Sequence, residues 1–218
     1  MEFQLDAIEA RLLGSLVEKS LTTPDQYPLT FHALMTSCNQ KTSRDPVMSL
    51  DPEAVDRGVR SLTDKGLVER LNAPGSRVPK FKHRFERLLK LASAQEIGAL
   101  CVLFLRGPQT PGEIKARADR LCEFASTAEV ESLLQDLSTR SDGACVARLP
   151  RQPGQKETRY QHLFSGPVAE APAGAAPAAA PLAPASAPGD ERVARLERRV
   201  DALEELVKTL EARLSRPA

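Results

Sequence analysis

The chain contains no tryptophan, and aromatic residues make up only 4% of its 218 residues. A hydrophobic core must therefore be built mainly from leucine, valine and alanine, which suits small domains. The four cysteines, Cys38, Cys101, Cys122 and Cys145, include no CxxC pair. Their scatter argues against a disulfide framework or a zinc site and favours a reduced compartment. The sequence predicts no metal and no cofactor.

Long apolar segments are also missing. The longest run extends from about Ala99 to Leu105, far short of the ~20 residues that a membrane-spanning helix needs. The N-terminal segment is acidic and amphipathic, without the basic region that precedes the apolar run of a signal peptide. We therefore expect a cytoplasmic protein that has no membrane partner.

Sequence motifs of common enzyme classes are absent too. The chain has no glycine-rich phosphate loop, no HExxH and no GxSxG motif, and its three histidines are isolated. Cys122 lies close to Arg117 and Arg120, which could lower the pKa of its thiol. A small buried cysteine is the commoner role. The sequence therefore predicts a non-enzymatic protein, with an enzyme of unrecognised site as a weaker alternative.

The C-terminal part of the chain differs in composition from the rest. Residues 167–189 are rich in alanine and proline and predict a disordered linker, because proline interrupts the helix that alanine favours. Residues 190–216 follow a strict heptad pattern, which predicts a coiled-coil helix that pairs two chains in a parallel homodimer. The predicted dimerisation seam consists of Val193, Leu196, Val200, Leu203, Val207, Leu210 and Leu214.

Residues 1–90 are expected to form a first domain of three helices and a β-hairpin. Apolar spacing predicts a helix near the N-terminus and a second one at 29–39, where Thr30 is a possible cap. Asp51 as N-cap and Pro52 in the first turn predict the start of a third helix. The expected strands lie at residues 67–71 and 80–85. Three helices followed by a two-stranded ribbon is the winged-helix order.

Residues 91–166 repeat this order of signals without repeating the residues themselves. Thr110 followed by Glu113, and Ser126 followed by Glu129, are capping-box patterns that predict the second and third helices of this domain. The expected strands lie at residues 145–149 and 159–163. The predicted fold class is mainly α with small β-hairpins (α+β), arranged as two tandem winged helix-turn-helix domains.

Four segments resemble the bacterial YceH family, also called UPF0502 or DUF480. They are LVEKSLTTPDQYPLT at 16–30, CNQKTSRDPVM at 38–48, LRGPQTPGEI at 105–114 and RQPGQKETRY at 151–160. The similarity spans roughly residues 5–165 and leaves the linker outside. The resemblance implies tandem winged-helix domains, and it implies no particular activity.

Winged helices most often bind double-stranded DNA, with the third helix in the major groove and the wing on phosphates. The net charge of +1 does not decide this question, but the distribution of charge is informative. Residues 66–92 hold seven bases against two acids, and residues 148–159 hold four against one. We therefore expect the wings to contact phosphates. The candidate nucleic-acid-binding residues are Lys41, Arg44, Arg57, Arg60, Arg77, Lys80, Lys82, Arg84, Arg151, Lys156 and Arg159.

The leading hypothesis is a dimeric, DNA-associated or regulatory protein. Its rival is a protein-interaction adaptor resembling the tandem winged-helix subunits of chromosome-condensing complexes, an analogy of fold alone. The expected third helix of the second domain favours this rival, because its outward residues include no base. The polar segment 39–46 leaves two interpretations open as well. Asn39, Ser43 and Asp45 brace a turn, or the segment is a recognition surface for a peptide or nucleic acid.

Overall fold

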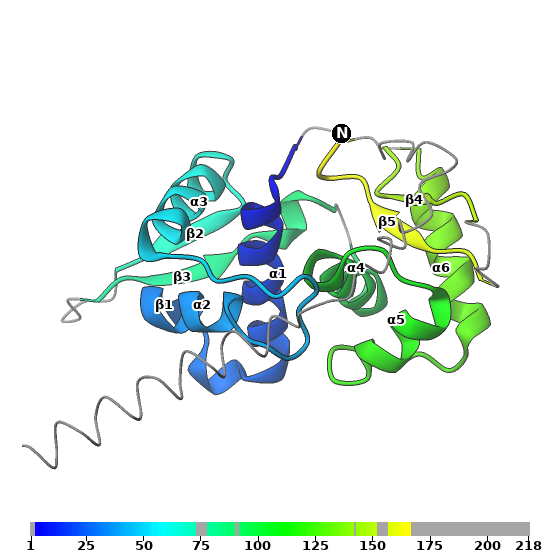
Figure 1. Cartoon of the computed structure of the whole chain (residues 1–218), viewed down its shortest axis with the longest axis horizontal. Coiled ribbons are helices and arrows are strands. Elements are labelled where there is room, and N and C mark those ends of the chain that lie inside the picture. The colour runs from blue at the N-terminus through cyan, green and yellow to red at the C-terminus, as the bar shows by residue number, and fades with distance from the viewer. Residues whose placement is uncertain (1–2, 73–77, 90–91, 142, 152–156, 167–218) are drawn as a thin grey trace, which may run out of the picture. The chain divides into compact units, whose positions relative to one another are not determined.

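The computed structural model describes residues 3–72, 78–89, 92–141, 143–151 and 157–166 (Figure 1). They all belong to one compact unit, Met1–Glu170. The predicted linker and coiled coil, with the whole dimerisation seam, lie outside the described residues, as do the candidates Arg77 and Lys156. The described part contains six α-helices and two small antiparallel sheets. The predicted α+β class is thus confirmed.

The first half of the unit begins with a long helix and ends with a hairpin. Its elements are α1 (Ala7–Thr22), β1 (Leu29–Thr30), α2 (Phe31–Cys38), α3 (Pro52–Asp64), β2 (Val68–Leu71) and β3 (Lys80–His83). The predicted helix caps are present. The Thr30 hydroxyl accepts a hydrogen bond from the Ala33 N–H at 3.3 Å, and the Asp51 carboxylate accepts one from the Ala54 N–H at 2.7 Å.

Strand β1 was not predicted, because the sequence assigned its two residues to the start of a helix. It completes a three-stranded sheet of order β1-β3-β2, with both pairs antiparallel. Leu29 lies opposite Phe81, and Val68 lies opposite His83. A two-residue strand has no periodicity of its own to detect, and it pairs with residues that are remote in sequence.

The second half repeats the helices and the hairpin. Its elements are α4 (Ala94–Arg106), α5 (Pro111–Ala118), α6 (Thr127–Thr139), β4 (Val146–Arg148) and β5 (Tyr160–His162). An isolated bridge between Gln109 and Tyr160 takes the place that β1 has in the first half. Both halves therefore follow the order helix, short bridge or strand, two helices, hairpin.

Of the two capping boxes predicted in this half, the one at Thr110 is confirmed and the one at Ser126 is corrected. Thr110 and Glu113 bond each other's backbone N–H groups, as a capping box requires. The Ser126 hydroxyl accepts from the Glu129 N–H at 3.1 Å, but the Glu129 carboxylate accepts from the Ala125 N–H at 2.6 Å instead of from Ser126. The second cap is thus half of the predicted box, because the carboxylate reaches one residue further back.

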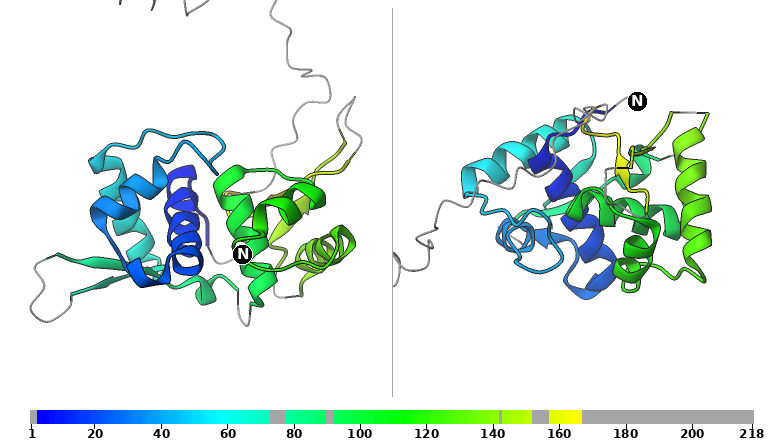
Figure 2. Two further views of the ribbon diagram at one scale, coloured as in Figure 1. Left: turned by 90° about the horizontal axis from the view of Figure 1, so that it is seen from below. Right: turned by 45° about the vertical axis from the view of Figure 1, so that its right-hand side comes forward.

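Helices α1 and α4 pack against each other and join the two halves (Figure 2). Gly14 of α1 allows their close approach, because a Cβ atom at this position would lie 3.0 Å from the Leu105 and Phe104 side chains. The Cys101 thiol donates to the Gly14 carbonyl at 3.4 Å. The core is continuous through this contact. The predicted domains 1–90 and 91–166 therefore pack into one unit.

Two further contacts connect the halves: a backbone hydrogen bond, and an aromatic contact between Phe85 and Phe104 of α4. The Leu5 N–H donates to the Phe164 carbonyl at 2.6 Å. The rings of Phe85 and Phe104 meet edge to face with centroids 6.0 Å apart, and Phe104 meets His162 in the same way at 4.7 Å. Such aromatic contacts add to the apolar burial of each ring. No helix in the described ranges is long and apolar enough to cross a membrane.

Candidate functional site

The first hairpin presents two lysines to solvent. Along β3, Phe81 is buried and His83 is half-buried, whereas Lys80 and Lys82 are exposed. This alternation follows from the pleat of a strand, whose successive side chains point to opposite faces. We call Lys80 and Lys82 the lysine face. Packing of Phe81 and His83 on the core fixes these lysines on the outer side of the sheet.

Acidic residues of the hairpin are engaged by arginine. Glu69 lies opposite Lys82 in the strand register, yet its carboxylate forms an ion pair with Arg84 at 2.7 Å. Arg84 also lies 3.6 Å from the Glu86 carboxylate. Among the described residues, Lys80 and Lys82 have no ion pair. Of the cations predicted to bind here, Arg84 is thus engaged by Glu69 and Glu86. Lys80 and Lys82 have no such acidic partner among the described residues.

The two arginines of α3 are exposed, as predicted, but each has an acidic neighbour one turn away. The Arg57 guanidinium lies 3.7 Å from the Glu53 carboxylate, and that of Arg60 lies 2.8 Å from Asp56. The Arg60 side chain remains 76% exposed. Exposed pairs of this kind contribute little energy, so the guanidinium groups stay available to another anion.

The cations of the second hairpin bond to their own half. Arg159 pairs with Glu113 at 3.0 Å and donates to the Pro108 carbonyl at 2.8 Å. Arg151 is exposed, and its Nε donates to the Thr158 hydroxyl at 3.1 Å. The exposed residues of α6 include no base, as expected from the sequence: Thr127, Ala128, Glu129, Glu131, Ser132, Gln135, Asp136 and Thr139. The second half therefore offers fewer available cations than predicted.

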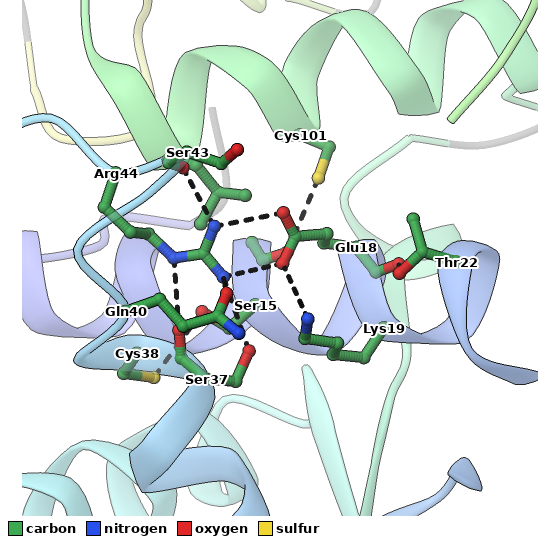
Figure 3. A network of polar contacts seen from close by, with 12 residues as sticks. Ser15, Glu18, Lys19, Thr22, Ser37, Cys38, Gln40, Ser43, Arg44 and Cys101 are labelled. Atoms are coloured by element: carbon green, nitrogen blue, oxygen red, sulfur yellow. Dashed lines mark hydrogen bonds and ion pairs between the residues drawn. The ribbon is translucent and has the colours of Figure 1, made fainter. Parts of the chain in front are cut away.

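The candidate Arg44 is corrected by the structure. It is only 4% exposed, and its guanidinium forms two hydrogen bonds to the Glu18 carboxylate, at 3.0 and 2.6 Å (Figure 3). It also donates to the Ser37 carbonyl at 3.2 Å. A buried charge requires such a paired and hydrogen-bonded environment. Arg44 therefore stabilises the contact between α1 and the loop that follows α2. It cannot act as a surface cation. Lys41 of the same loop is exposed and has no ion pair among the described residues.

The polar segment 39–46 braces the fold through the side chains of Asn39 and Arg44 and through its backbone. The Asn39 side chain exchanges two hydrogen bonds with the Leu50 backbone, at 2.9 and 2.8 Å. The Asp45 N–H donates to the Leu105 carbonyl of α4 at 2.9 Å. The buried Arg11 donates to the Pro46 carbonyl at 2.7 Å. The bracing interpretation thus holds for the Asn39 side chain, while Asp45 contributes through its backbone.

A polar cleft of about 200 Å³ lies beside this segment. It is lined by the end of α1, the loop at residues 40–43, the end of α4, and α5 with the turn after it. Four cations line it: Lys19, Arg106, Arg117 and Arg120. Nothing in the sequence groups these four residues, because they come from separate elements. In the sequence, the only sign of a cationic cluster is that Arg117 and Arg120 lie close to each other and to Cys122.

The described titratable groups with shifted pKa values are all buried or partly buried. Burial raises the pKa of the Cys122 thiol to about 11, so the lowering that nearby arginines could cause does not occur, and the packing role favoured from the sequence fits better. Burial lowers the pKa of His162 to about 4, and it lowers that of His83, whose Nε2 lies 3.0 Å from the Ser20 hydroxyl. The described residues hold no cluster of three or more His, Cys, Asp or Glu that could bind a metal ion.

The fold and its surfaces define a two-part α+β protein whose halves share one element order and whose first hairpin is cationic. The chain matches the family model described as "Protein of unknown function, DUF480" over residues 5–155. This match covers more than half of the 218 residues, so the chain belongs to the DUF480 family. The resemblance seen in the sequence is thereby confirmed, and the family description leaves the function to be argued from the molecule.

Proposed function

We propose that this chain is a non-enzymatic, cytoplasmic, DNA-associated protein built from two tandem winged-helix domains. The order of elements supports the winged-helix assignment. Each half runs from a helix through a short strand or bridge to two helices and a hairpin. In winged-helix proteins the third helix and the hairpin are the parts that approach DNA. The four cysteines, all free, agree with a reduced compartment.

The observation that carries the DNA proposal is the state of Lys80 and Lys82. Both side chains are exposed, and neither has an ion pair among the described residues. An ammonium group on a flexible stem suits phosphate contact as a point charge. Each phosphate that is neutralised releases counterions, which supplies affinity independent of DNA sequence. The lysine face would therefore position the protein on the backbone, not select a sequence.

Helix α3 is proposed to add limited base reading. In both Figures 1 and 2, α3 and the β2–β3 hairpin lie on the side of α1 that is remote from α4. Arg57 and Arg60 are the exposed bases of this helix, and guanidinium groups are suited to bidentate contact with guanine. Their acidic neighbours Glu53 and Asp56 repel phosphates, so the contribution of α3 to affinity is expected to be smaller than that of the lysine face.

The proposed assembly is a homodimer paired through the C-terminal heptads. Linking two copies raises the effective concentration of the second DNA-binding module once the first is bound. Deleting residues 190–218 should halve the mass measured by light scattering. A mass that does not change on deletion would refute the assignment of this segment as the dimerising element.

The DNA proposal is tested by fluorescence anisotropy of a labelled duplex across a salt series. Among the described residues, the exposed cations of the first half that have no ion pair are Lys41, Arg70, Lys80, Lys82 and Arg87. The slope of log K against log salt should therefore be about −4 to −5, at ~0.9 per phosphate. The double variant Lys80→Glu/Lys82→Glu should reduce this slope by about 2 and weaken binding to unrelated duplexes equally.

Lys115→Glu is the matched control for the single variant Lys82→Glu. Both make the same chemical change, but Lys115 lies on α5 in the other half. Lys115→Glu should leave the salt slope unchanged, whereas Lys82→Glu should lower it by about 1. If no duplex is retained at low salt, or if the two variants weaken binding equally, the lysine face is not the contact.

A protein-interaction adaptor is the second candidate, and the surface of α6 favours it. The exposed residues of this helix include Glu131 and Asp136 and no base. Such a helix is a poor partner for phosphates and a reasonable one for a basic protein surface. Affinity purification with and without nuclease treatment separates the two proposals. A partner that survives nuclease supports the adaptor, and a partner that is lost with the nucleic acid supports DNA association.

A further inference from the structure

The polar cleft beside the loop at residues 40–43 joins the two halves of the unit. The first half contributes the end of α1 with Lys19 and the loop with Thr42 and Ser43. The second half contributes Arg106 from the last turn of α4, and Arg117 and Arg120 from α5 and the turn after it. A group bound here would contact both halves at once.

Positive charge in this cleft exceeds negative charge. Glu18 is the only carboxylate among the lining residues, and the buried Arg44 holds it through two hydrogen bonds at 3.0 and 2.6 Å (Figure 3). Lys19 lies 3.6 Å from the same carboxylate, and Arg117 lies 3.6 Å from Glu113. In the described part of the chain, Arg106 and Arg120 have no ion pair. The cluster therefore holds cations that its own acids do not balance.

The packing around Arg106 makes this imbalance costly. Burial lowers the pKa of its guanidinium, and the positive charges of Arg117 and Arg44 lower it further, while the carboxylates of Asp45 and Glu18 raise it by less. Like charges that the fold holds together repel each other, and an anion placed among them relieves the repulsion.

The size and the polar groups of the cleft restrict what could fill it. A volume of about 200 Å³ is smaller than a typical drug-sized pocket of roughly 300–1,000 Å³. Thr42 and Ser43 bring hydroxyl groups to the wall. Guanidinium groups match the oxygens of a phosphate through paired hydrogen bonds, and a lysine adds a point charge.

We propose that this cleft is a binding site for a small phosphate-bearing anion, of about the size of pyrophosphate or a phosphorylated three-carbon acid. Arg106 and Arg120 contact the phosphate oxygens, with Lys19 and Arg117 at the rim. The ligand joins α1 and its loop to α4 and α5. This site uses none of the residues of the lysine face. The anion-binding proposal can therefore be tested independently of the DNA proposal.

Isothermal titration of the full chain with inorganic pyrophosphate at low salt tests the site. Saturable binding is expected, and Arg106→Gln and Arg120→Gln should each raise Kd about 10-fold or more, the usual effect of losing a charge-assisted hydrogen bond. Arg57→Gln is the matched control, because it removes an exposed arginine of α3 outside the cleft. It should change Kd by less than about 2-fold. Without ligand, Arg120→Gln should melt at the same temperature as the wild type or higher, since repulsion is removed.

Citrate and duplex DNA separate this site from general attraction to anions. Citrate carries similar charge without phosphate and should bind at least about 10-fold more weakly than pyrophosphate. Lys82→Glu should leave pyrophosphate binding unchanged. The proposal is overturned by the absence of saturable binding, by equal affinity for citrate, or by equal losses in Arg57→Gln and Arg120→Gln. It is also overturned if Lys82→Glu abolishes pyrophosphate binding, because the anion would then bind at the lysine face.

Discussion

The two halves of the unit share one order of elements and present different surfaces. The third helix of the first half, α3, exposes Arg57 and Arg60, whereas the third helix of the second half, α6, exposes Glu131 and Asp136 and no base. Within the described ranges, the lysine face of the first hairpin has no ion pair, while Arg159 of the second hairpin pairs with Glu113. Apolar spacing and helix caps set the topology, and the surface residues are free to specify a role in each half.

The connections between the second and third helices differ as well. In the second half, residues 119–126 join α5 to α6 directly. In the first half, residues 39–51 form a longer loop that carries the buried Arg44 and reaches the Leu105 carbonyl of α4. The longer loop therefore does more than connect two helices, because its contacts help to join the halves. Six variants, two of them controls, test this comparison.

The largest effect is expected from Arg44→Met. Removing the guanidinium leaves the Glu18 carboxylate, whose side chain is only 13% exposed, without its main partner. Breaking one side of a buried ion pair typically costs about 3 to 5 kcal/mol. Urea unfolding should therefore show a loss in the free energy of unfolding of this size.

The double variant Glu18→Leu/Arg44→Met is the control for that loss. Replacing both charges with apolar groups removes the uncompensated carboxylate, so at least half of the lost stability should return. A single variant that loses less than about 1 kcal/mol would show that the ion pair is solvated and that the loop does not depend on it.

Gly14→Leu should have the next largest effect, because it alters the contact that joins the halves. A Cβ alone would already lie 3.0 Å from Leu105 and Phe104. Overpacking of a well-packed contact costs about 1 to 3 kcal/mol, and the four added carbons place this variant at the upper end. Gly112→Leu on α5 is the matched control, since a Cβ there meets only the Thr110 hydroxyl oxygen at 4.0 Å. Equal melting temperatures of the two variants would contradict the close α1–α4 packing.

Acid should weaken the second half through His162. Burial lowers the pKa of its ring from an unfolded value of 6.5 to about 4, so the folded state resists protonation. The stabilising contribution is complete above pH ~6.5 and is lost as the pH falls toward ~4, with about 2 kcal/mol lost by pH ~5. Urea unfolding at these pH values measures the loss.

His162→Phe should remove this share of the pH dependence. The ring packs against Phe104 and Phe164, and its Nδ1 has no hydrogen-bond partner among the described residues, so an apolar ring suits the site. Burial also lowers the pKa of His83, which leaves part of the dependence in the variant. Identical pH dependence in the variant and the wild type would exclude His162 as the titrating group.

The smallest effect is expected from Arg60→Gln on α3. The arginine pairs with Asp56 at 2.8 Å, but its side chain is 76% exposed. Surface pairs one turn apart contribute about 0.3 to 0.5 kcal/mol. The free energy of unfolding of Arg60→Gln, measured with urea, should therefore differ from that of the wild type by no more than this amount. The loss expected for Arg44→Met is much larger. A loss above about 1 kcal/mol would mean that this surface pair is as important to the fold as the buried one.

Much of the fold was predictable because its signals are local. Asp51 with Pro52, and Thr110 with Glu113, marked helix starts that the structure confirms. Gly66, just beyond the end of α3, has φ of 70°, a left-handed conformation that glycine adopts readily. Capping depends on residues within one turn, so a single sequence contains the information.

Other features depend on partners that are remote in sequence. Arg44 lies in a polar loop, and nothing in the sequence of that loop reveals that its side chain is buried and paired with Glu18 of α1. Strand β1 exists because Leu29 pairs with Phe81. The cations of the cleft come from α1, α4, α5 and the turn after α5, and only the packing of these elements groups them. Charge counts along the chain identified the basic hairpin, but they did not show that Arg84 is paired while Lys80 and Lys82 are not.

Acylation of lysines in the presence and absence of duplex DNA tests the central claim most directly. Mass spectrometry reports the labelling rate of each lysine in the full-length protein. DNA should slow the labelling of Lys80 and Lys82 several-fold and leave Lys115 unchanged. Unchanged labelling of Lys80 and Lys82 with the duplex bound would contradict phosphate contact through the first hairpin.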